Sequence, residues 1–332
     1  MSSRVVTARV AALPAPSAEW RRMALAAAHE RHQALAAEAA CLHGIEAVDR
    51  PTSEAGSAVR VAAWNAERLK HVEAAAELLR VVEADVILLT EVDCGMARSG
   101  NRHTVADLAV QLSMSFRFAV EFVELGLGDP AERAAHAGAI NDGGLHGAAI
   151  LSRVPLSADR LVRLGDDGAW FDGSRKGERR VGGRIGLAAD VALAGGPLTL
   201  CAIHLESHSD AAHRANQMRT LLGSLGRASP AVVAGDLNTK KAGSGAVMDE
   251  AAPSDEPLFA AARQAGFGWQ SANAPGPTQR LRPHEPPVPL LRLDWMLVRD
   301  VAASRPLTIP AVGRDGTVLA DHDVLVADLE LR

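Results

Sequence analysis

Polar residues that could bind a metal ion or a phosphate group stand at the ends of apolar runs in this sequence of 332 residues. Asn65 follows residues 61–64, Glu91 follows 86–90, His204 follows 200–203, Asp236 and Asn238 follow 232–235, Asp294 precedes 295–298, and Asp321 and His322 precede the final run. A single Asp after a strand is usually a turn former or a helix cap. The same feature at run after run indicates a shared site instead.

The chemistry of this set points to a hard divalent cation. Grouping several carboxylates away from water costs several kcal/mol per ion unless a cation compensates them. Oxygen-rich ligands with few sulfur atoms suit Mg²⁺ or Mn²⁺ rather than zinc. Such a site fits hydrolysis of a phosphate ester, which needs a barrier reduction of roughly 20 kcal/mol or more. In this interpretation Glu91 holds the metal, Asp236 accepts a proton from water, and histidines donate hydrogen bonds to phosphate oxygens.

Composition narrows the functional class further. The chain contains no Tyr, so a mechanism that needs a tyrosine phenol is excluded. Its cysteines, Cys41, Cys94 and Cys201, are too few and too scattered for a disulfide framework or a zinc cluster. The net charge of −5 argues against unspecific coating of nucleic acid but leaves room for a local basic cleft. Without a secretory signal pattern or a membrane-spanning apolar run, we expect a cytoplasmic protein, and nothing in the sequence implies a protein partner.

The elements that must position these residues follow a strand-rich rhythm from residue 59 onward. Short apolar runs recur, and helical patterns separate only some of them, at residues 70–83, 105–112 and 210–225. Many strands with few intervening helices predict an α/β fold with two packed, mostly antiparallel sheets flanked by helices.

The N-terminal segment reads differently. Residues 1–16 are expected to form a loose tail, and Ser17 is expected to cap an extra N-terminal helix that continues to about His43, with a break in its apolar period at Arg31. A linker then follows at 51–56. We therefore divide the chain into a segment of tail, helix and linker at 1–58 and a catalytic domain at 59–332.

The motifs of the second segment resemble the endonuclease/exonuclease/phosphatase superfamily. In order along the chain they are Trp64-Asn65, Leu89-Thr90-Glu91-Val92-Asp93, Gly147-Ala148-Ala149-Ile150-Leu151-Ser152-Arg153, His204-Leu205-Glu206-Ser207, Gly235-Asp236-Leu237-Asn238, Leu293-Asp294-Trp295 and Asp321-His322-Asp323. The resemblance runs from about Val59 to Leu331. It implies a four-layer α/β sandwich and metal-dependent hydrolysis of phosphate esters.

The resemblance also implies individual roles. Asn65 and Glu91 are similar to metal-site residues, and Asp321 is expected to approach the metal. Asp236 resembles the Asp that activates water, and Asn238 the Asn that orients it or contacts phosphate. His204 and His322 resemble phosphate-binding histidines, with Asp294 or Asp321 orienting His322.

Some positions depart from the superfamily pattern. Ala148 stands where many members have Asn, and Thr90 where Gln is frequent. Members that use a site tyrosine, such as AP endonucleases, differ from this chain, and His204 places it nearer the histidine-using branches. The run His204-Leu205-Glu206-Ser207, followed by Arg214 and Gln217, is similar to tyrosyl-DNA phosphodiesterase 2.

Basic residues suggest a polyanionic substrate. Arg175, Lys176, Arg179, Arg180 and Arg184 lie in one stretch, which is either a solvated loop or a landing strip for an anion. Arg184 is the first candidate for phosphate contact and Arg280 the second. We therefore expect a nuclease or DNA-end-processing phosphodiesterase, with a phosphatase or phosphodiesterase for lipids, inositol phosphates or small molecules as the alternative.

Overall fold

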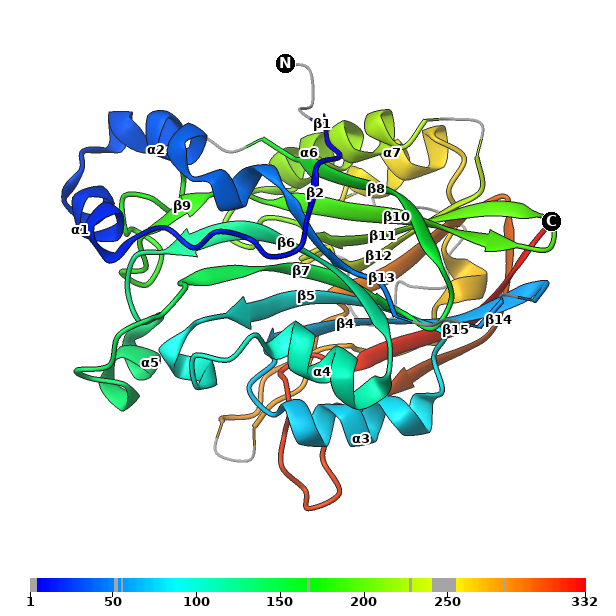
Figure 1. The fold of residues 1–332 in the computed structure, drawn as a ribbon. Helices are drawn as coiled ribbons and strands as arrows, with labels where there is room; N and C mark the ends of the chain where they lie inside the picture. Colours follow the sequence, from blue (N-terminus) through cyan, green and yellow to red (C-terminus); the bar gives the residue numbers. More distant parts are fainter. Residues whose placement is uncertain are drawn as a thin grey trace.

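Two β-sheets stacked face to face form the centre of the molecule (Figure 1). The computed structural model describes residues 5–50, 53, 54, 56–165, 168–226, 229–240, 255–282 and 285–332. One sheet has six strands in the order β1 (Val5–Val6), β8 (Leu156–Arg163), β10 (Ile185–Leu193), β11 (Gly196–His204), β12 (Ala231–Asp236) and β13 (Asp294–Arg299). Its pairs are antiparallel except for β11 with β12.

The second sheet has nine strands and contains most of the first half of the chain. The order is β14 (Val301–Ile309), β15 (Val324–Leu331), β4 (Ala58–Arg68), β5 (Val86–Cys94), β7 (Leu145–Ser152), β6 (Ser115–Glu124), β3 (Ile45–Val48) and β2 (Arg9–Val10), and β9 (Arg180–Gly182) also pairs with β6. Only β4 with β5 and β2 with β3 are parallel. The predicted pair of mostly antiparallel sheets is confirmed.

Alternating side chains of the strands build separate cores on the two faces of each sheet. In β4, Val59, Val61 and Ala63 point into the core between the sheets, whereas Ala62 and Trp64 point to the outer face. The strand period of two residues explains this division. On the outer faces, α3 (Val72–Val82) and α4 (Thr104–Leu112) cover the nine-stranded sheet, and α6 (Ala211–Ser224) and α7 (Leu258–Gln264) cover the other. This is the expected four-layer sandwich.

Shorter helical elements lie between some of the strands. They are α5 (Pro130–Ala135) and the 3₁₀ turns η3 (Ala97–Ser99) and η5 (Gln270–Ala272). None of the helices in the described ranges is long and apolar enough to cross a membrane.

The predicted N-terminal helix is present, but it is more interrupted than the single break at Arg31 indicated. Ser17 does cap a helix, accepting from the Trp20 N–H at 3.1 Å, but the chain is broken into α1 (Ala18–Ala26), η1 (His29–Arg31), α2 (His32–Glu38) and η2 (Ala40–His43). The backbone is extended at Ala27 and Ala28. Arg179 from a distant loop donates to the carbonyls of Leu25 and Ala27, at 2.6 and 2.8 Å, and so satisfies groups that the break leaves without helix partners.

The segment before residue 59 also contributes strands to both sheets. β1 pairs with β8 in the six-stranded sheet, and β3 pairs with β6 in the nine-stranded sheet. The expectation of a loose tail over 1–16 is therefore wrong for β1 and β2, whose pairing partners lie far along the chain. The division of the chain at residue 58 stays a prediction about domain organisation.

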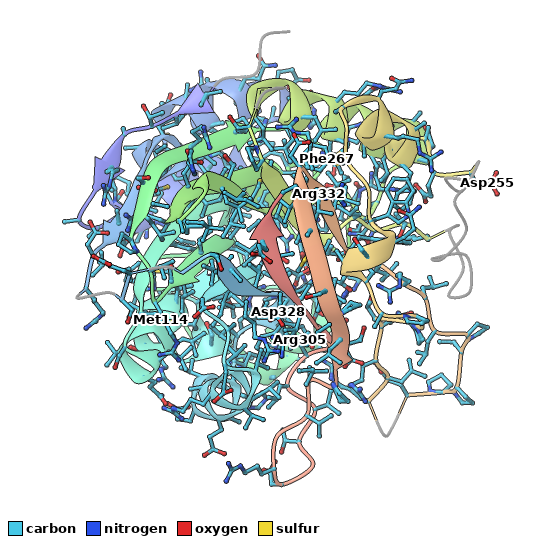
Figure 2. The ribbon with its side chains drawn as sticks, turned by 90° about the vertical axis from the view of Figure 1, so that its right-hand side faces the viewer. Met114, Asp255, Phe267, Arg305, Asp328 and Arg332 are labelled. Atoms are coloured by element: carbon cyan, nitrogen blue, oxygen red, sulfur yellow. The ribbon has the colours of Figure 1, made fainter. Side chains whose placement is uncertain are left out.

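Charged pairs mark the edge formed by β14 and β15. Figure 2 shows Arg305 beside Asp328, and these two side chains form an ion pair. Arg60 of β4 reaches the same carboxylate at 2.7 Å. Charges on an edge strand discourage pairing with a further strand. These side chains therefore disfavour the addition of another strand at this edge of the sheet.

Candidate active site

Neighbouring strand ends of the six-stranded sheet bring three predicted residues together. His204 at the end of β11 lies opposite Asp236 at the end of β12, because these strands are parallel and in register. Asp294 at the start of antiparallel β13 lies opposite Asp236 on its other side. All three are buried. The side-chain row His204, Asp236, Asp294 therefore follows directly from strand pairing.

The nine-stranded sheet adds Asn65 and Glu91 to this row. Nδ2 of Asn65, in β4, donates to Oδ2 of Asp236 and to Oε1 of Glu91, both at 3.2 Å. Oε1 of Glu91 also lies 3.9 Å from Nδ1 of His204. Glu91 has φ +54° within a register shift of β5. These contacts join the ends of the two sheets at one site.

A glycine makes the approach of β12 to β11 possible. Gly235 has φ +142°, and a Cβ added to it would lie 2.1 Å from the carbonyl oxygen of Ile203. Non-glycine side chains neither adopt this φ nor fit this space. Gly235 thus sets the backbone that holds Asp236 opposite His204.

Replacing Gly235 with Ala is expected to unfold the protein more readily than the same change at Gly196. Gly196 has φ +128° but no atom of the described residues within 4 Å of its Cβ position, so Gly196→Ala measures backbone strain alone, about 1–3 kcal/mol. Gly235→Ala adds the collision with Ile203 and should cost clearly more. Urea unfolding measures both differences, and equal losses would contradict this steric role of Gly235.

His322 is held as a charged donor beside Asp236. Its Nδ1 lies 2.7 Å from Oδ2 of Asp294, and its Nε2 lies 3.8 Å from Oδ2 of Asp236. Burial alone lowers the pKa of an imidazole, but the Asp294 and Asp236 carboxylates outweigh it and hold the pKa of His322 well above its ordinary value. Thr278 fixes Asp294, donating from Oγ1 to Oδ2 at 2.6 Å. Of the two predicted partners, Asp294 is thus the closer, since Oδ1 of Asp321 lies 4.0 Å from Nε2.

His204 is neutral, whereas His322 is charged. Burial and the nearby Arg184 hold the pKa of His204 well below its ordinary value, so the ring is neutral. Arg184 can only donate, and its NH1 lies 2.8 Å from Nδ1 of His204. The proton of the ring therefore sits on Nε2, which faces Oδ2 of Asp236 at 3.5 Å. The two site histidines flank one carboxylate in different charge states.

Asp236 carries charge that its surroundings do not fully compensate. Burial raises the pKa of the Asp236 carboxyl to about 7, with His322 and the Asn238 N–H opposing the rise and Asp294 and Glu91 adding to it. The Asn238 N–H donates to Oδ1 at 2.8 Å, and Nδ2 of Asn238 is tied to the Leu205 carbonyl at 3.1 Å. Asn238 thus orients Asp236 from the loop that follows β12.

The residues present fit a hard divalent cation. The carboxylates of Glu91 and Asp236 both contact Nδ2 of Asn65, at 3.2 Å. Asp236 also lies in a cluster with Asp294 and His322 whose nearest N and O atoms are within 4.8 Å of one another, although His322 in its charged form is not itself a ligand. The raised pKa of Asp236 is the sign of uncompensated negative charge that a cation would remove. Asn65 presents its amide N–H to the carboxylates, while its oxygen accepts from the Glu67 N–H at 3.2 Å. The predicted metal role of Asn65 therefore requires the reverse amide orientation, and that of Asp321, whose side chain is 42% exposed, stays a prediction.

Two residues of the predicted basic stretch are paired with carboxylates. Arg180 pairs with Glu178 and with Glu124, and Arg184 lies 3.4 Å from Glu121 and 3.3 Å from Glu206. The side chains of both arginines are 4% exposed. Arg280 pairs bidentately with Asp323 at 2.6 and 2.9 Å. Phosphate contact by Arg184 or Arg280 stays a prediction, and Lys176 is an exposed cation of the strip.

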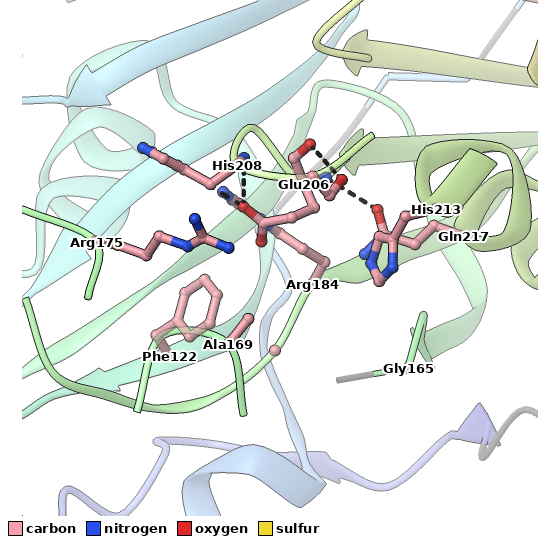
Figure 3. Close-up of a pocket in the computed structure, with 11 residues that line it drawn as sticks. Phe122, Gly165, Ala169, Arg175, Arg184, Glu206, His208, His213 and Gln217 are labelled. Carbon is pink, nitrogen blue, oxygen red and sulfur yellow. Dashed lines mark hydrogen bonds and ion pairs between the residues drawn. The ribbon is translucent and has the colours of Figure 1, made fainter. Parts of the chain in front are cut away.

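Figure 3 shows how Arg184 is positioned. A cavity on one side of it is lined by Phe122, Arg175, Glu206, His208 and Gln217, among others. The Glu206 N–H donates to Gln217 at 2.9 Å, and Glu206 accepts from the His208 N–H at 2.9 Å. Glu206 also accepts from the Trp170 indole at 2.8 Å. The motif residues Glu206 and Gln217 thus support Arg184, which in turn contacts His204.

Several site residues escaped the sequence reasoning. Arg68 forms an ion pair with Glu91, and Thr278 binds Asp294 from a loop, where no periodic pattern marks it. His146 and Asp93 form a buried pair, with Nδ1 of His146 2.8 Å from Oδ1 of Asp93. A signal existed for this pair, because Asp93 lies within the Glu91 motif and His146 directly precedes the Gly147 motif.

Comparisons with known proteins agree with this fold. A search among curated proteins finds no match. Among solved structures, the chain is similar to an endonuclease/exonuclease/phosphatase from Beutenbergia cavernae, with 21% identity and a TM-score of 0.58 over 83% of this chain and 72% of that one. The chain is also similar to the human Nocturnin catalytic domain with bound sulfate, with 17% identity and a TM-score of 0.56 over 85% of this chain and 98% of that one. For D. rerio TDP2 complexed with a single-strand DNA product, the identity is 17% and the TM-score is 0.54, over 82% of this chain and 99% of that one.

At these identities the solved structures show a shared fold alone. The profile described as the Endonuclease/Exonuclease/phosphatase family matches residues 62–322. This range contains the site residues from Asn65 to His322. The chain therefore belongs to the endonuclease/exonuclease/phosphatase family.

Proposed function

We propose that this protein hydrolyses a phosphate ester by metal-assisted attack of water, as a nuclease or DNA-end-processing phosphodiesterase. The observation that carries the proposal is the continuous set of contacts that joins Glu91, Asn65, Asp236, His204 and His322, each contact no longer than 3.9 Å. A site with one poised carboxylate, one charged and one neutral histidine suits proton transfer from water beside a phosphate.

Each residue has a distinct role in this proposal. Asp236 accepts the proton of the attacking water, and its pKa of about 7 suits a base working near neutral pH. His322, charged through Asp294, donates to a phosphate oxygen, and neutral His204 donates from Nε2. Asn238 orients Asp236. Glu91, with Asn65 and Asp321, would hold Mg²⁺ or Mn²⁺, which when bound neutralises phosphoryl charge and stabilises the leaving oxygen.

One observation favours the alternative substrate class of small phosphorylated molecules. The arginines that suggested a DNA-binding strip, Arg180 and Arg184, are buried in ion pairs with Glu178, Glu124, Glu121 and Glu206. Polynucleotide binding gains affinity from exposed cations that contact several phosphates. A compact phosphate ester needs fewer such contacts.

Removal of divalent metal is expected to abolish turnover. The purified protein is incubated with nicked, abasic, single-stranded and 5′-adducted DNA, and with inositol phosphates, lipid phosphates and nucleotides, in the presence of Mg²⁺, Mn²⁺ or EDTA. We expect hydrolysis of at least one substrate with metal and none with EDTA. Metal should also raise the Tm, because the site carboxylates repel one another without a cation. At a hundredfold excess over Kd, metal binding adds about 2.7 kcal/mol to the free energy of unfolding. Hydrolysis that persists in EDTA would disprove the metal-assisted reaction.

The pattern of substrates decides between the two classes. Cleavage confined to DNA supports the nuclease, whereas phosphate release from small esters alone supports the alternative. The Asp236→Asn variant, assayed with each substrate in parallel, serves as the control for contaminating activity.

A further inference from the structure

A cavity adjoins Glu91 on the side of the site that carries Arg184. Its lining includes Arg68, Glu91, His146, Lys176, Arg184 and Ser207. Because Glu91 is the proposed metal ligand and Arg184 contacts His204 at 2.8 Å, this space lies next to the position of the scissile phosphate. A part of the substrate beyond that phosphate can occupy it.

His146 presents an acceptor to this cavity. Its side chain is 1% exposed, and its Nδ1 lies 2.8 Å from Oδ1 of Asp93. Asp93 accepts two hydrogen bonds from Arg98, both at 2.9 Å, which fixes it as a carboxylate and therefore as an acceptor. Arg98 NH2 also lies 3.4 Å from Nδ1 of His146, but the shorter contact with Asp93 favours the tautomer with the proton on Nδ1, which leaves a lone pair on Nε2. Among the described residues, Nε2 has no hydrogen-bond partner.

The other polar groups of the cavity are mostly engaged. Arg68 pairs with Glu91, and Arg180 pairs with Glu178. The Ser207 hydroxyl lies 2.8 Å from Nδ1 of His208. A bound group that donates to Nε2 of His146 gains a hydrogen bond there.

The surrounding charges decide what that group is. The lining holds four cationic side chains, those of Arg68, Lys176, Arg180 and Arg184, and two carboxylates, those of Glu91 and Glu178. The three arginines are paired with carboxylates. Lys176 is exposed, and its charge favours a neutral or negatively charged group over a second metal ion or an ammonium group. A hydroxyl group is the neutral donor that a phosphate ester of a sugar or polyol places near its phosphorus.

We propose that His146 is a specificity-determining residue that accepts a hydrogen bond from a hydroxyl group next to the scissile phosphate. The inference rests on the proposed function and narrows it, because ribonucleotides and polyol phosphates carry such a hydroxyl and the deoxyribose within a DNA strand does not. Asp93 acts as the positioning residue, since it fixes the ring orientation and the tautomer of His146.

The test compares binding of ligand pairs that differ in hydroxyl groups. The metal-loaded Asp236→Asn protein, which holds ligands without cleaving them, is titrated calorimetrically with glycerol phosphate and propyl phosphate. A second pair is a ribose dinucleotide and its deoxyribose analogue, and this pair separates a nucleic acid source from a polyol source. We expect at least one hydroxyl-bearing member to bind about tenfold or more tightly, the value of one hydrogen bond of about 1.4 kcal/mol.

Variants at His146 isolate the acceptor. Adding His146→Phe should reduce the preference to about one and leave the Kd of the hydroxyl-free member unchanged. His146→Gln should restore part of the preference, because its amide oxygen can accept at the same place. His103→Phe is the matched control, since His103 also pairs with a carboxylate, Glu46 at 3.1 Å, but does not line the cavity.

Three results would overturn the proposal. They are equal binding within both ligand pairs, an equal loss for both members in His146→Phe, and Mn²⁺ binding at least tenfold weaker in His146→Phe, which would make His146 a metal ligand. Failure of the proposed function looks different. In that case the wild-type protein hydrolyses no phosphate ester with metal, whatever the binding preference of the Asp236→Asn protein.

Discussion

Asp236→Asn is expected to lower kcat by about 10²–10⁴ while the metal-free protein stays at least as stable as the wild type at pH 8. Turnover falls because the amide cannot accept the proton of water. Stability is retained because burial raises the pKa of Asp236 to about 7, far above that of an unfolded Asp. The ionised carboxyl is therefore less favourable in the folded protein than in the unfolded chain.

The sign follows from linkage between protonation and folding. Below about pH 4, Asp236 is protonated in both states, and its full contribution to stability is present. As the pH rises from about 4 to about 7, the unfolded chain has given up this proton while the folded protein keeps it, so wild-type stability declines, and above about pH 7 the loss is complete. Asp236→Asn removes this decline, and the Tm difference between variant and wild type should grow in favour of the variant from pH 5 to pH 8.

The control is Asp142→Asn, at an exposed carboxylate outside the site, which should change neither kcat nor the pH dependence of Tm. Both quantities are measured on the same preparations, kcat with metal and Tm with EDTA. Full activity in Asp236→Asn would refute its role as the base. A Tm that falls below the wild type at pH 8 would refute the unfavourable burial of its charge.

The strand ends were readable from sequence because burial and chemistry change at the same residue. In residues 231–236 an apolar run ends in Asp236, and the same change occurs at Asn65 and His204. Strand pairing then places these residues next to one another, as His204 opposite Asp236 illustrates. The core of the site was therefore predictable from local pattern together with the resemblance to a family.

The partners of the buried charged residues could not be predicted from the sequence in the same way. The stretch around Arg180 and Arg184 shows its charge, but the carboxylates that neutralise it come from β6 and from the loop after β11. A partial signal was present in β6, where Glu121 and Glu124 interrupt an apolar run and all ten residues of the strand are buried. Carboxylates inside a buried strand require cationic partners, so these positions could have indicated ion pairs instead of a free basic surface.

The break in the N-terminal helix had only a weak local signal, an interruption of the apolar period at Arg31. Ala27 and Ala28 are good helix formers, yet both are extended because the chain turns to pack Leu35 and Leu42 into the outer core of the nine-stranded sheet. Arg179, which caps the break, lies about 150 residues away in sequence. Tertiary packing therefore overrides propensity here.

The second large effect is expected for Asp294→Asn, which should lower kcat about 10²-fold or more at pH 8 and less at pH 6. Asp294 is the carboxylate closest to His322, at 2.7 Å, and it is the main group that raises the pKa of His322 against the cost of burial. The amide can still accept from Nδ1 and from Thr278, so the ring keeps its place. The ring should lose its charge at a lower pH, because Asp294 no longer raises the pKa of His322.

The pH profile separates this explanation from simple structural damage. In the wild type, activity that depends on charged His322 is lost only at high pH, whereas in Asp294→Asn the same loss should begin at a lower pH. Asp321→Asn is the matched comparison, because its carboxylate is 42% exposed and 4.0 Å from Nε2, so it should move the alkaline limb much less. A uniform drop at all pH values in Asp294→Asn would show that Asp294 acts through position alone. A larger alkaline shift in Asp321→Asn would make Asp321 the partner that keeps His322 charged.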